Sequence, residues 1–241
     1  MVYFRLIFVL FCISFLSNAQ IKKEFSYNHI VGKSNYFLNK EPKHGLIPKV
    51  ADSFDSMKAA AKLDGIEIIM ISGYRSFNDQ KNIWNKKFLK NELNGFSVDE
   101  NIKKIIEYST IPGTSRHHWG TDIDIVDGSY NIDGDVLITE KFYGNGPYVK
   151  LRKWLDKNSH KYGFYQVYTN DKNRNGFKHE PWHYSYAPIS IDILNLFLEL
   201  DLKKIFISNK IMGASYLDSV FIKKYKEEFV LGINSYLKIK K

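Results

Sequence analysis

The chain has 241 residues and a formal net charge of +9, from 35 Lys and Arg against 26 Asp and Glu. Its hydrophobic content of 44% and charged content of 25% are those of a globular protein, which excludes a disordered or fibrous chain. The positive charge suits an anionic partner such as a cell wall or a membrane surface. No basic run is dense enough to indicate nucleic-acid binding, so we expect no nucleic-acid partner.

The N-terminal residues 1–19 have the pattern of a secretory signal peptide. Arg5 supplies the positive region, an apolar run covers residues 6–16, and Ser17-Asn18-Ala19 is a small-residue cleavage site before Gln20. The apolar run is short for a permanent membrane anchor, although a retained anchor is the alternative. We therefore expect an exported protein of the periplasm or cell envelope, with no stable membrane span after cleavage.

Cysteine use limits the chemistry of the chain. Cys12 is the only cysteine, and it lies inside the apolar run of the predicted signal peptide. The mature protein would therefore have neither disulfides nor a catalytic thiol, and any metal site must use His, Asp or Glu.

The first half of the mature chain predicts helices around one strand. Apolar residues at helical spacing predict helices over 50–63, 78–89 and 98–108. A short β-branched run over 66–71 predicts a buried strand, and it leads directly into a turn-like segment over 72–76.

A second strand is predicted from Thr121, after the break that Pro112 and Gly113 introduce. The sequence Thr-Asp-Ile-Asp-Ile-Val alternates with a period of two residues, as a half-buried strand does. Ile123 and Ile125 would then face the core, and Asp122 and Asp124 would share the opposite face.

The rest of the chain continues with strands and helices of similar length. We expect an Asp-Gly turn between strand-like pieces over 131–136, a helix over 148–160, strands over 163–168 and 182–186, and helices over 191–202 and 216–230. The predicted fold class is α+β, with a small, mainly antiparallel sheet flanked by helices. Residues 20–188 would form one domain, and residues 189–241 a helical C-terminal extension packed on it.

Two short stretches carry the residue types of a catalytic zinc site. His117 precedes a glycine-containing turn that leads into the strand of Asp124, and His183 lies on a strand predicted some sixty residues later. Zinc accepts histidine nitrogens and carboxylate oxygens, and a catalytic site needs only three protein ligands. Glu180, held three residues before His183 by an intervening proline, is a candidate general base. Asp122 shares a face with Asp124, so the carboxylate ligand stays open between these two.

The spacing of these residues resembles a known family. The pattern Ser115-x-His-x-x-Gly-x-x-x-Asp124, followed by Glu180-Pro-Trp-His, is similar to the LAS group of zinc peptidases, and specifically to VanY-like D-alanyl-D-alanine carboxypeptidases. The Ser-Gly-Tyr-Arg-Ser segment over 72–76 with Gln80, and the stretch from Asn158 to Glu180, match as well. The resemblance covers about residues 49–188.

The resemblance implies a hedgehog/D-Ala-D-Ala-peptidase-like fold and a role for each motif residue. One Zn²⁺ ion would be bound by His117, Asp124 and His183. Glu180 would be the catalytic base and later the proton donor, and Arg75 would stabilise the substrate carbonyl oxygen as it gains negative charge. The peptide site would be lined by Ser115, Tyr74 and Gln80. One departure is Asp122, which stands where many members have Ala.

The function that this resemblance implies is that of an exported zinc carboxypeptidase, which removes the C-terminal D-alanine from peptidoglycan stem peptides. Two alternatives use the same fold: an LD-carboxypeptidase or peptidoglycan endopeptidase, and a non-catalytic zinc-containing module that binds the wall. The presence of both Glu180 and Arg75 argues against the last, because a binding module needs no base. The sequence leaves the oligomeric state open.

Two other histidines lie next to the motif residues. His118 and His179 flank the predicted ligand and base, and each is expected to be an orienting or surface group rather than a ligand. The polar segment 171–176 imitates the first half of a calcium loop, but its twelfth position is Trp182 rather than Glu, so it is expected to be a turn.

Overall fold

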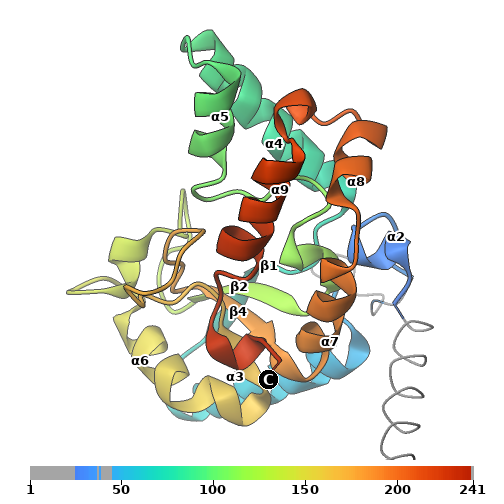
Figure 1. The fold of residues 1–241 in the computed structure, drawn as a ribbon. Helices are drawn as coiled ribbons and strands as arrows, with labels where there is room; N and C mark the ends of the chain where they lie inside the picture. The colour runs from blue at the N-terminus through green and yellow to red at the C-terminus, as the bar shows by residue number, and fades with distance from the viewer. Residues whose placement is uncertain (1–24, 37, 39–44, 240–241) are drawn as a thin grey trace, which may run out of the picture.

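The computed structural model describes residues 25–36, 38 and 45–239. The predicted signal peptide therefore lies outside the described residues. Within them, helices surround a single four-stranded antiparallel sheet, which confirms the predicted α+β class (Figure 1). None of the described helices combines the length and apolar character that a membrane span requires.

The sheet has the strand order β1-β2-β4-β3 and every neighbouring pair is antiparallel. Its strands are β1 Ile68–Ser72, β2 Asp122–Asp127, β3 Phe164–Gln166 and β4 His183–Tyr186. All four lie within the ranges predicted for strands or extend them by a residue or two. The central pair, β2 and β4, carries both stretches that the sequence indicates as functional.

The register of the sheet places polar side chains on one face. Asp124 lies opposite Ser72 of β1 and opposite His183 of β4, and Asp122 lies opposite Ser185. Directly opposed residues of antiparallel strands project to the same face, and a residue two positions along the strand does so too. The two aspartates, the histidine and both serines therefore share one face of the sheet.

The other face of the sheet is apolar and forms part of the core. Ile123 pairs with Tyr184 across β2 and β4, and both side chains are fully buried, as is Ile125. Phe54 of α3 (Pro48–Leu63) packs edge to face on Phe164 of β3. In Figure 1, α3 and α6 (Val149–Asn158) lie below the sheet.

Two capped helices lie on the other side of the molecule, beyond the polar face. The α4 helix (Phe77–Leu93) begins where the Ser76 hydroxyl accepts a hydrogen bond from the Asp79 backbone amide at 3.1 Å. The α5 helix (Val98–Ile105) has the same arrangement at Ser97. In both, the acidic residue three positions on bonds back to the cap, which satisfies amides that the helix leaves free.

The C-terminal extension differs from its prediction in where the helices start and stop. It forms α7 Ala187–Leu198, α8 Leu202–Ser208 and α9 Ser219–Tyr225, with a π-helical turn over Lys226–Val230. Pro188 starts α7 earlier than predicted, because proline suits the first helical turn. Asp201 then caps a separate helix, and Asp218 caps α9.

The segment over 131–136 was also predicted incorrectly. It contains a turn at Gly134, whose φ is +72°, but no strand on either side. Residues 131–135 are exposed and none pairs with the sheet, so nothing stabilises an extended pair there. Among the described residues, the remaining short helical segments are α2 Tyr27–Ile30 and turns at Arg116–Trp119, Thr139–Phe142, Ser159–Tyr162, Ala214–Tyr216 and Ser235–Leu237.

The extension is hydrogen-bonded to the segments that lead into both functional stretches. The buried Tyr225 hydroxyl lies 2.8 Å from the Thr114 hydroxyl and 3.4 Å from the Ile111 amide, just before Ser115. The Asn234 side-chain amide donates to the Gln166 carbonyl, and Arg174 donates to the Gly232 carbonyl. Burial raises the pKa of Tyr225 to about 12, so its hydroxyl keeps its proton as a donor.

We predict that Tyr225→Phe destabilises the protein through this contact. The substitution removes one hydroxyl and leaves buried partners unsatisfied, which costs about 1–3 kcal/mol of unfolding free energy. Denaturant unfolding measures the effect, and Tyr216→Phe in the same extension is the matched control, because Tyr216 is 56% exposed. Equal unfolding free energies for the two variants would show that the Tyr225 contact contributes nothing.

Candidate active site

A tight turn brings His117 to the polar face of the sheet. Residues Arg116–Trp119 form a 3-10 turn that ends at Gly120, whose φ of +68° lies in the left-handed region that glycine adopts without strain. The strand β2 begins two residues later. The backbone amide of Arg75 donates to the His117 carbonyl at 3.1 Å, so the turn is also attached to the segment after β1.

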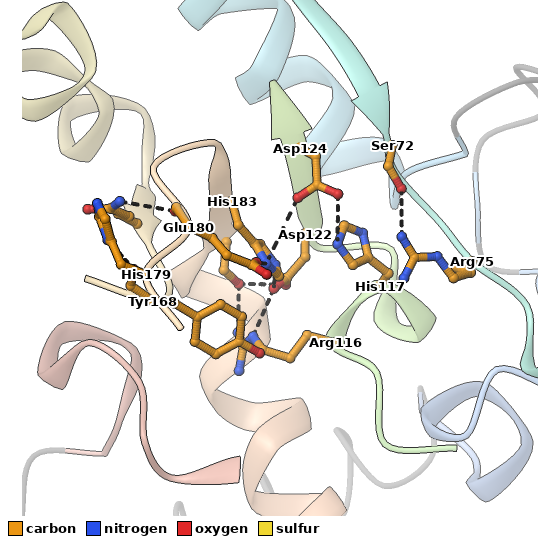
Figure 2. Close-up of polar contacts among 12 residues, drawn as sticks. Ser72, Arg75, Arg116, His117, Asp122, Asp124, Tyr168, His179, Glu180 and His183 are labelled. Atoms are coloured by element: carbon orange, nitrogen blue, oxygen red, sulfur yellow. Dashed lines mark hydrogen bonds and ion pairs between the residues drawn. The ribbon is translucent and has the colours of Figure 1, made fainter. Parts of the chain in front are cut away.

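The two predicted histidines and Asp124 converge on one point (Figure 2). His117 Nε2 lies 3.3 Å from Asp124 Oδ2, and His183 Nδ1 lies 3.9 Å from Asp124 Oδ1. The two imidazole centroids are 4.7 Å apart, and all three side chains are buried. One ligand atom from each residue lies within 4.8 Å of the others.

The ring nitrogens of His117 and His183 that face away from Asp124 make hydrogen bonds within the protein. His117 Nδ1 lies 2.7 Å from the Gly73 carbonyl oxygen, to which it can only donate. His183 Nε2 lies 3.1 Å from Asp122 Oδ2. His117 Nε2 and His183 Nδ1 face Asp124, so the hydrogen bonds at the other two nitrogens select which nitrogen of each ring is directed at the centre of the cluster.

The donor set fits zinc. A tetrahedral ion with bonds of about 2.0–2.2 Å separates its ligands by about 3.3–3.6 Å, close to the spacings seen around Asp124. Asp124 Oδ1 is buried and makes no hydrogen bond among the described residues. An unsatisfied buried carboxylate oxygen is costly, and a cation between these three side chains would satisfy it.

Between the two aspartates, the geometry favours Asp124 as the ligand. Asp122 Oδ2 accepts from Arg116 Nε at 2.8 Å, and Asp122 Oδ1 accepts from the Ser185 hydroxyl at 2.6 Å. Both oxygens of Asp122 are thus taken, and it contacts the side of the His183 ring that faces away from Asp124.

Glu180 lies at the edge of this cluster. Its Oε2 atom is 2.9 Å from His183 Nδ1, the nitrogen that faces Asp124, and its side chain is 12% exposed. The backbone holds it there, because the Glu180 amide donates to the Tyr168 carbonyl and its carbonyl accepts from Gln166 Nε2. The carboxylate therefore lies beside the open side of the cluster without belonging to the three-residue set.

Arg75 is fixed on the opposite side of the cluster by two side chains. Its Nη1 donates to Gln80 Oε1 at 3.0 Å and its Nη2 to the Ser72 hydroxyl at 3.3 Å. Gln80 is itself held by the Thr110 carbonyl, which accepts from Nε2 at 2.8 Å. The guanidinium thus has a defined position with further donors left for a ligand.

A cavity of about 570 Å³ opens over the cluster. Its walls include all the predicted metal ligands, Glu180, Arg75 and Ser115. Tyr74 and Gln80 are not among its lining residues: Gln80 holds Arg75, and the Tyr74 hydroxyl donates to the Gly32 carbonyl at 3.1 Å. Arg116 and, on the α4 side, Lys87 add further cations to these walls.

The charges of the cluster are strongly coupled. Burial by itself lowers the pKa of the His183 imidazole, but hydrogen bonds to Asp122 and Glu180 outweigh it and raise that pKa to about 10. Burial raises the pKa of Asp124, yet the neighbouring His117 and His183 hold it below its usual range. Asp124 therefore stays ionised and available as an acceptor or ligand.

The two flanking histidines are not ligands in this arrangement. His118 is fully buried, where its Nδ1 donates to the Arg75 carbonyl and its Nε2 accepts from the Gly113 amide. Burial lowers the pKa of His118 to about 3, which matches a neutral ring that orients two backbone segments. His179 bonds to the Tyr168 carbonyl and the Tyr143 hydroxyl.

Several residues around the cluster were not identified from the sequence. Arg116 and Ser185 bind Asp122, and Tyr168 packs edge to face on His183 with ring centroids 5.1 Å apart. Of these, Arg116 could have been found from the sequence, because a cation within the motif can pair with an extra aspartate. Ser185 and Tyr168 have no such signal, because only the strand register brings them to the site.

Comparison with known proteins shows which family the chain is similar to. The family model described as VanY, D-alanyl-D-alanine carboxypeptidase, matches residues 43–189. A D-alanyl-D-alanine carboxypeptidase of Enterococcus faecalis is 33% identical over 143 residues, which are 59% of this chain and 47% of that protein. The putative carboxypeptidase YodJ of Bacillus subtilis is 32% identical over 153 residues, 63% of this chain and 50% of that protein. The chain thus spans about half the length of the curated relatives it matches.

Among solved structures, a mutant of the vancomycin resistance D,D-pentapeptidase VanY in complex with Zn(II) is 26% identical, with a TM-score of 0.48 over 66% of this chain and 82% of that one. The family match alone covers more than half of the chain and includes both motif stretches. The resemblance predicted from the motifs is therefore confirmed, and the chain belongs to the VanY family of D-alanyl-D-alanine carboxypeptidases.

Proposed function

We propose that this protein is an exported, zinc-dependent D-alanyl-D-alanine carboxypeptidase that removes the C-terminal D-alanine from peptidoglycan stem peptides. The observation that carries the proposal is the convergence of His117, Asp124 and His183 beneath a cavity. Glu180 lies beside His183 Nδ1, the nitrogen that faces Asp124. A zinc-binding module without catalysis would need neither this carboxylate nor the fixed guanidinium of Arg75.

In this proposal His117, Asp124 and His183 hold one Zn²⁺ ion. When bound, zinc would polarise the scissile carbonyl and make water a stronger nucleophile. Binding uses His117 Nε2 and His183 Nδ1, the nitrogens that the Gly73 carbonyl and Asp122 leave open.

Glu180 and Arg75 would carry the proton and the charge of the reaction. Glu180 takes a proton from the attacking water on its carboxylate and delivers it to the amide nitrogen of the leaving D-alanine, so that it ends the cycle ionised again. Arg75 donates to the substrate carbonyl oxygen as that oxygen becomes negative. Its bonds to Gln80 and Ser72 fix the guanidinium in advance, which avoids reorganisation during the reaction.

Substrate contacts follow from the walls of the cavity. Ser115 and Lys87 are proposed to contact the peptide and its terminal carboxylate, since both line the cavity. Gln80 is proposed to act through Arg75. Tyr74 stays a predicted substrate contact. Export rests on the pattern of residues 1–19, and detection of the processed protein in the cell envelope tests it.

Assays on defined stem peptides test the bond that is cut. We expect release of D-alanine from a pentapeptide ending in D-Ala-D-Ala, followed by mass analysis of the product. Cleavage of a tetrapeptide alone would indicate an LD-carboxypeptidase, and cleavage of a cross-linked or internal bond an endopeptidase. A protein that binds one zinc per chain and turns over none of these substrates would be a non-catalytic module, and the enzyme proposal would be wrong.

A further inference from the structure

Asp122 is the centre of a second polar cluster, beside the metal ligands. Its side chain is fully buried, and its Oδ2 atom accepts from Arg116 Nε at 2.8 Å and from His183 Nε2 at 3.1 Å. Figure 2 shows Asp122 and Arg116 on the side of the His183 ring that faces away from Asp124. Asp122 is also the position at which the chain departs from the resembling motif.

The other oxygen of Asp122 is equally constrained. Oδ1 accepts from the Ser185 hydroxyl at 2.6 Å and from the Thr121 hydroxyl at 2.8 Å. The Ser185 oxygen in turn accepts from Arg116 Nη2 at 2.7 Å, so its single proton points to Asp122. Arg116 is held over the Trp119 ring at 4.5 Å. Asp122 therefore has four donors and no freedom to rotate.

Stability gives no reason for this cluster. Removing a carboxylate and a guanidinium from water costs about as much as their attraction returns, and apolar pairs often serve a fold as well or better. The position of Asp122 in the sheet indicates another role. Asp122 lies opposite Ser185 across β2 and β4, and the next pair on the same face, Asp124 and His183, belongs to the metal site. The contact between Asp122 and His183 links this polar cluster to the metal site.

His183 has a carboxylate at each ring nitrogen. Glu180 lies 2.9 Å from Nδ1, and Asp122 lies 3.1 Å from Nε2. A neutral imidazole carries one proton, and a proton kept on Nδ1 would block the nitrogen that must bind the metal. The carboxylate that accepts the hydrogen bond from this ring N–H therefore decides whether Nδ1 can bind the metal.

We propose that Asp122, fixed by Arg116 and Ser185, is a positioning residue that keeps the His183 proton on Nε2 and so directs the Nδ1 lone pair to the zinc ion. The inference rests on the proposed zinc site but not on the substrate. Arg116 donates to the Asp122 carboxylate, and the hydroxyls of Ser185 and Thr121 fix its orientation. Glu180 then remains free of the His183 proton when it acts as the base.

Zinc affinity, measured by competition with a chromophoric chelator, tests this inference without any turnover. We expect Asp122→Ala to weaken zinc binding by about 10–100-fold, the usual effect of losing an outer partner of a histidine ligand. The double variant Arg116→Met/Asp122→Ala leaves no buried charge unpaired, and it should lose as much. Asp122→Asn retains an acceptor oxygen for Nε2, so it should restore affinity to within several-fold of the unmodified protein.

Another buried carboxylate on the same strand is the matched control. Asp127 is 1% exposed and accepts from the Glu67 and Ser129 amides, with no histidine contact within the described part of the chain. Asp127→Asn should lower stability yet leave zinc affinity within about threefold of the unmodified protein. The visible spectrum of the Co²⁺-loaded protein should change in Asp122→Ala and not in Asp127→Asn, because only the former disturbs a ligand.

The outcomes separate the two proposals. An unmodified protein that binds no zinc with one-to-one stoichiometry would overturn the metal site itself. If the unmodified protein binds zinc, and the double variant binds it within threefold with an unchanged Co²⁺ spectrum, the role of Asp122 is overturned while the metal site stands. The double variant serves also where Asp122→Ala alone fails to fold.

Discussion

Glu180→Gln is expected to lose hydrolysis while it still binds zinc. The amide is close in shape to the carboxylate but cannot accept the proton of water, and loss of general acid–base catalysis costs about 10²–10⁴-fold in rate. Glu180 is outside the three-residue ligand set, so one zinc per chain should remain. Measured together, kcat on a pentapeptide and zinc content distinguish a lost base from a lost metal.

The control for this substitution is Glu107→Gln. Glu107 is a surface carboxylate that pairs with Lys178 at 3.3 Å, and it does not line the cavity. Its substitution should leave kcat unchanged. Near-normal turnover by Glu180→Gln would contradict the assignment of the base.

His183→Ala is expected to lose both zinc and activity. The substitution removes a ligand nitrogen and also takes one hydrogen-bond donor from each of the carboxylates of Asp122 and Glu180. The loss of zinc affinity should therefore exceed the about 10–100-fold typical of substitutions outside the ligand set. Metal analysis after dialysis measures it.

His160→Ala is the matched control, because His160 is exposed and lies outside the cavity over the cluster. It should retain full zinc content. One-to-one zinc in His183→Ala would sink the ligand assignment, whatever the activity.

Much of the site could be predicted from the sequence because local geometry builds it. The two-residue alternation from Thr121 places Asp122 and Asp124 on one face, and the observed strand β2 does so. The glycine after the 3-10 turn explains how His117, seven residues before Asp124, returns to the same point.

The role of Asp122 could not be settled in this way, since it depends on which residue of β4 lies opposite. Ser185 reaches Asp122 through pairing between segments some sixty residues apart, and no local pattern reports that register. The break between α7 and α8 was not predicted either, for a different reason. The apolar periodicity continues across it, while the Asp201 side chain restarts the backbone hydrogen bonding at Lys204.

The register of β2 and β4 has a consequence for how the protein reaches its working state. A slip of one residue between these strands would turn Asp124 or His183 toward the apolar face and abolish the set of three ligands. A metal ion that binds only the correct pairing adds its binding free energy to that pairing alone. Zinc would thus stabilise only the correct strand alignment during folding. Chains with misaligned strands would bind no metal and would be inactive.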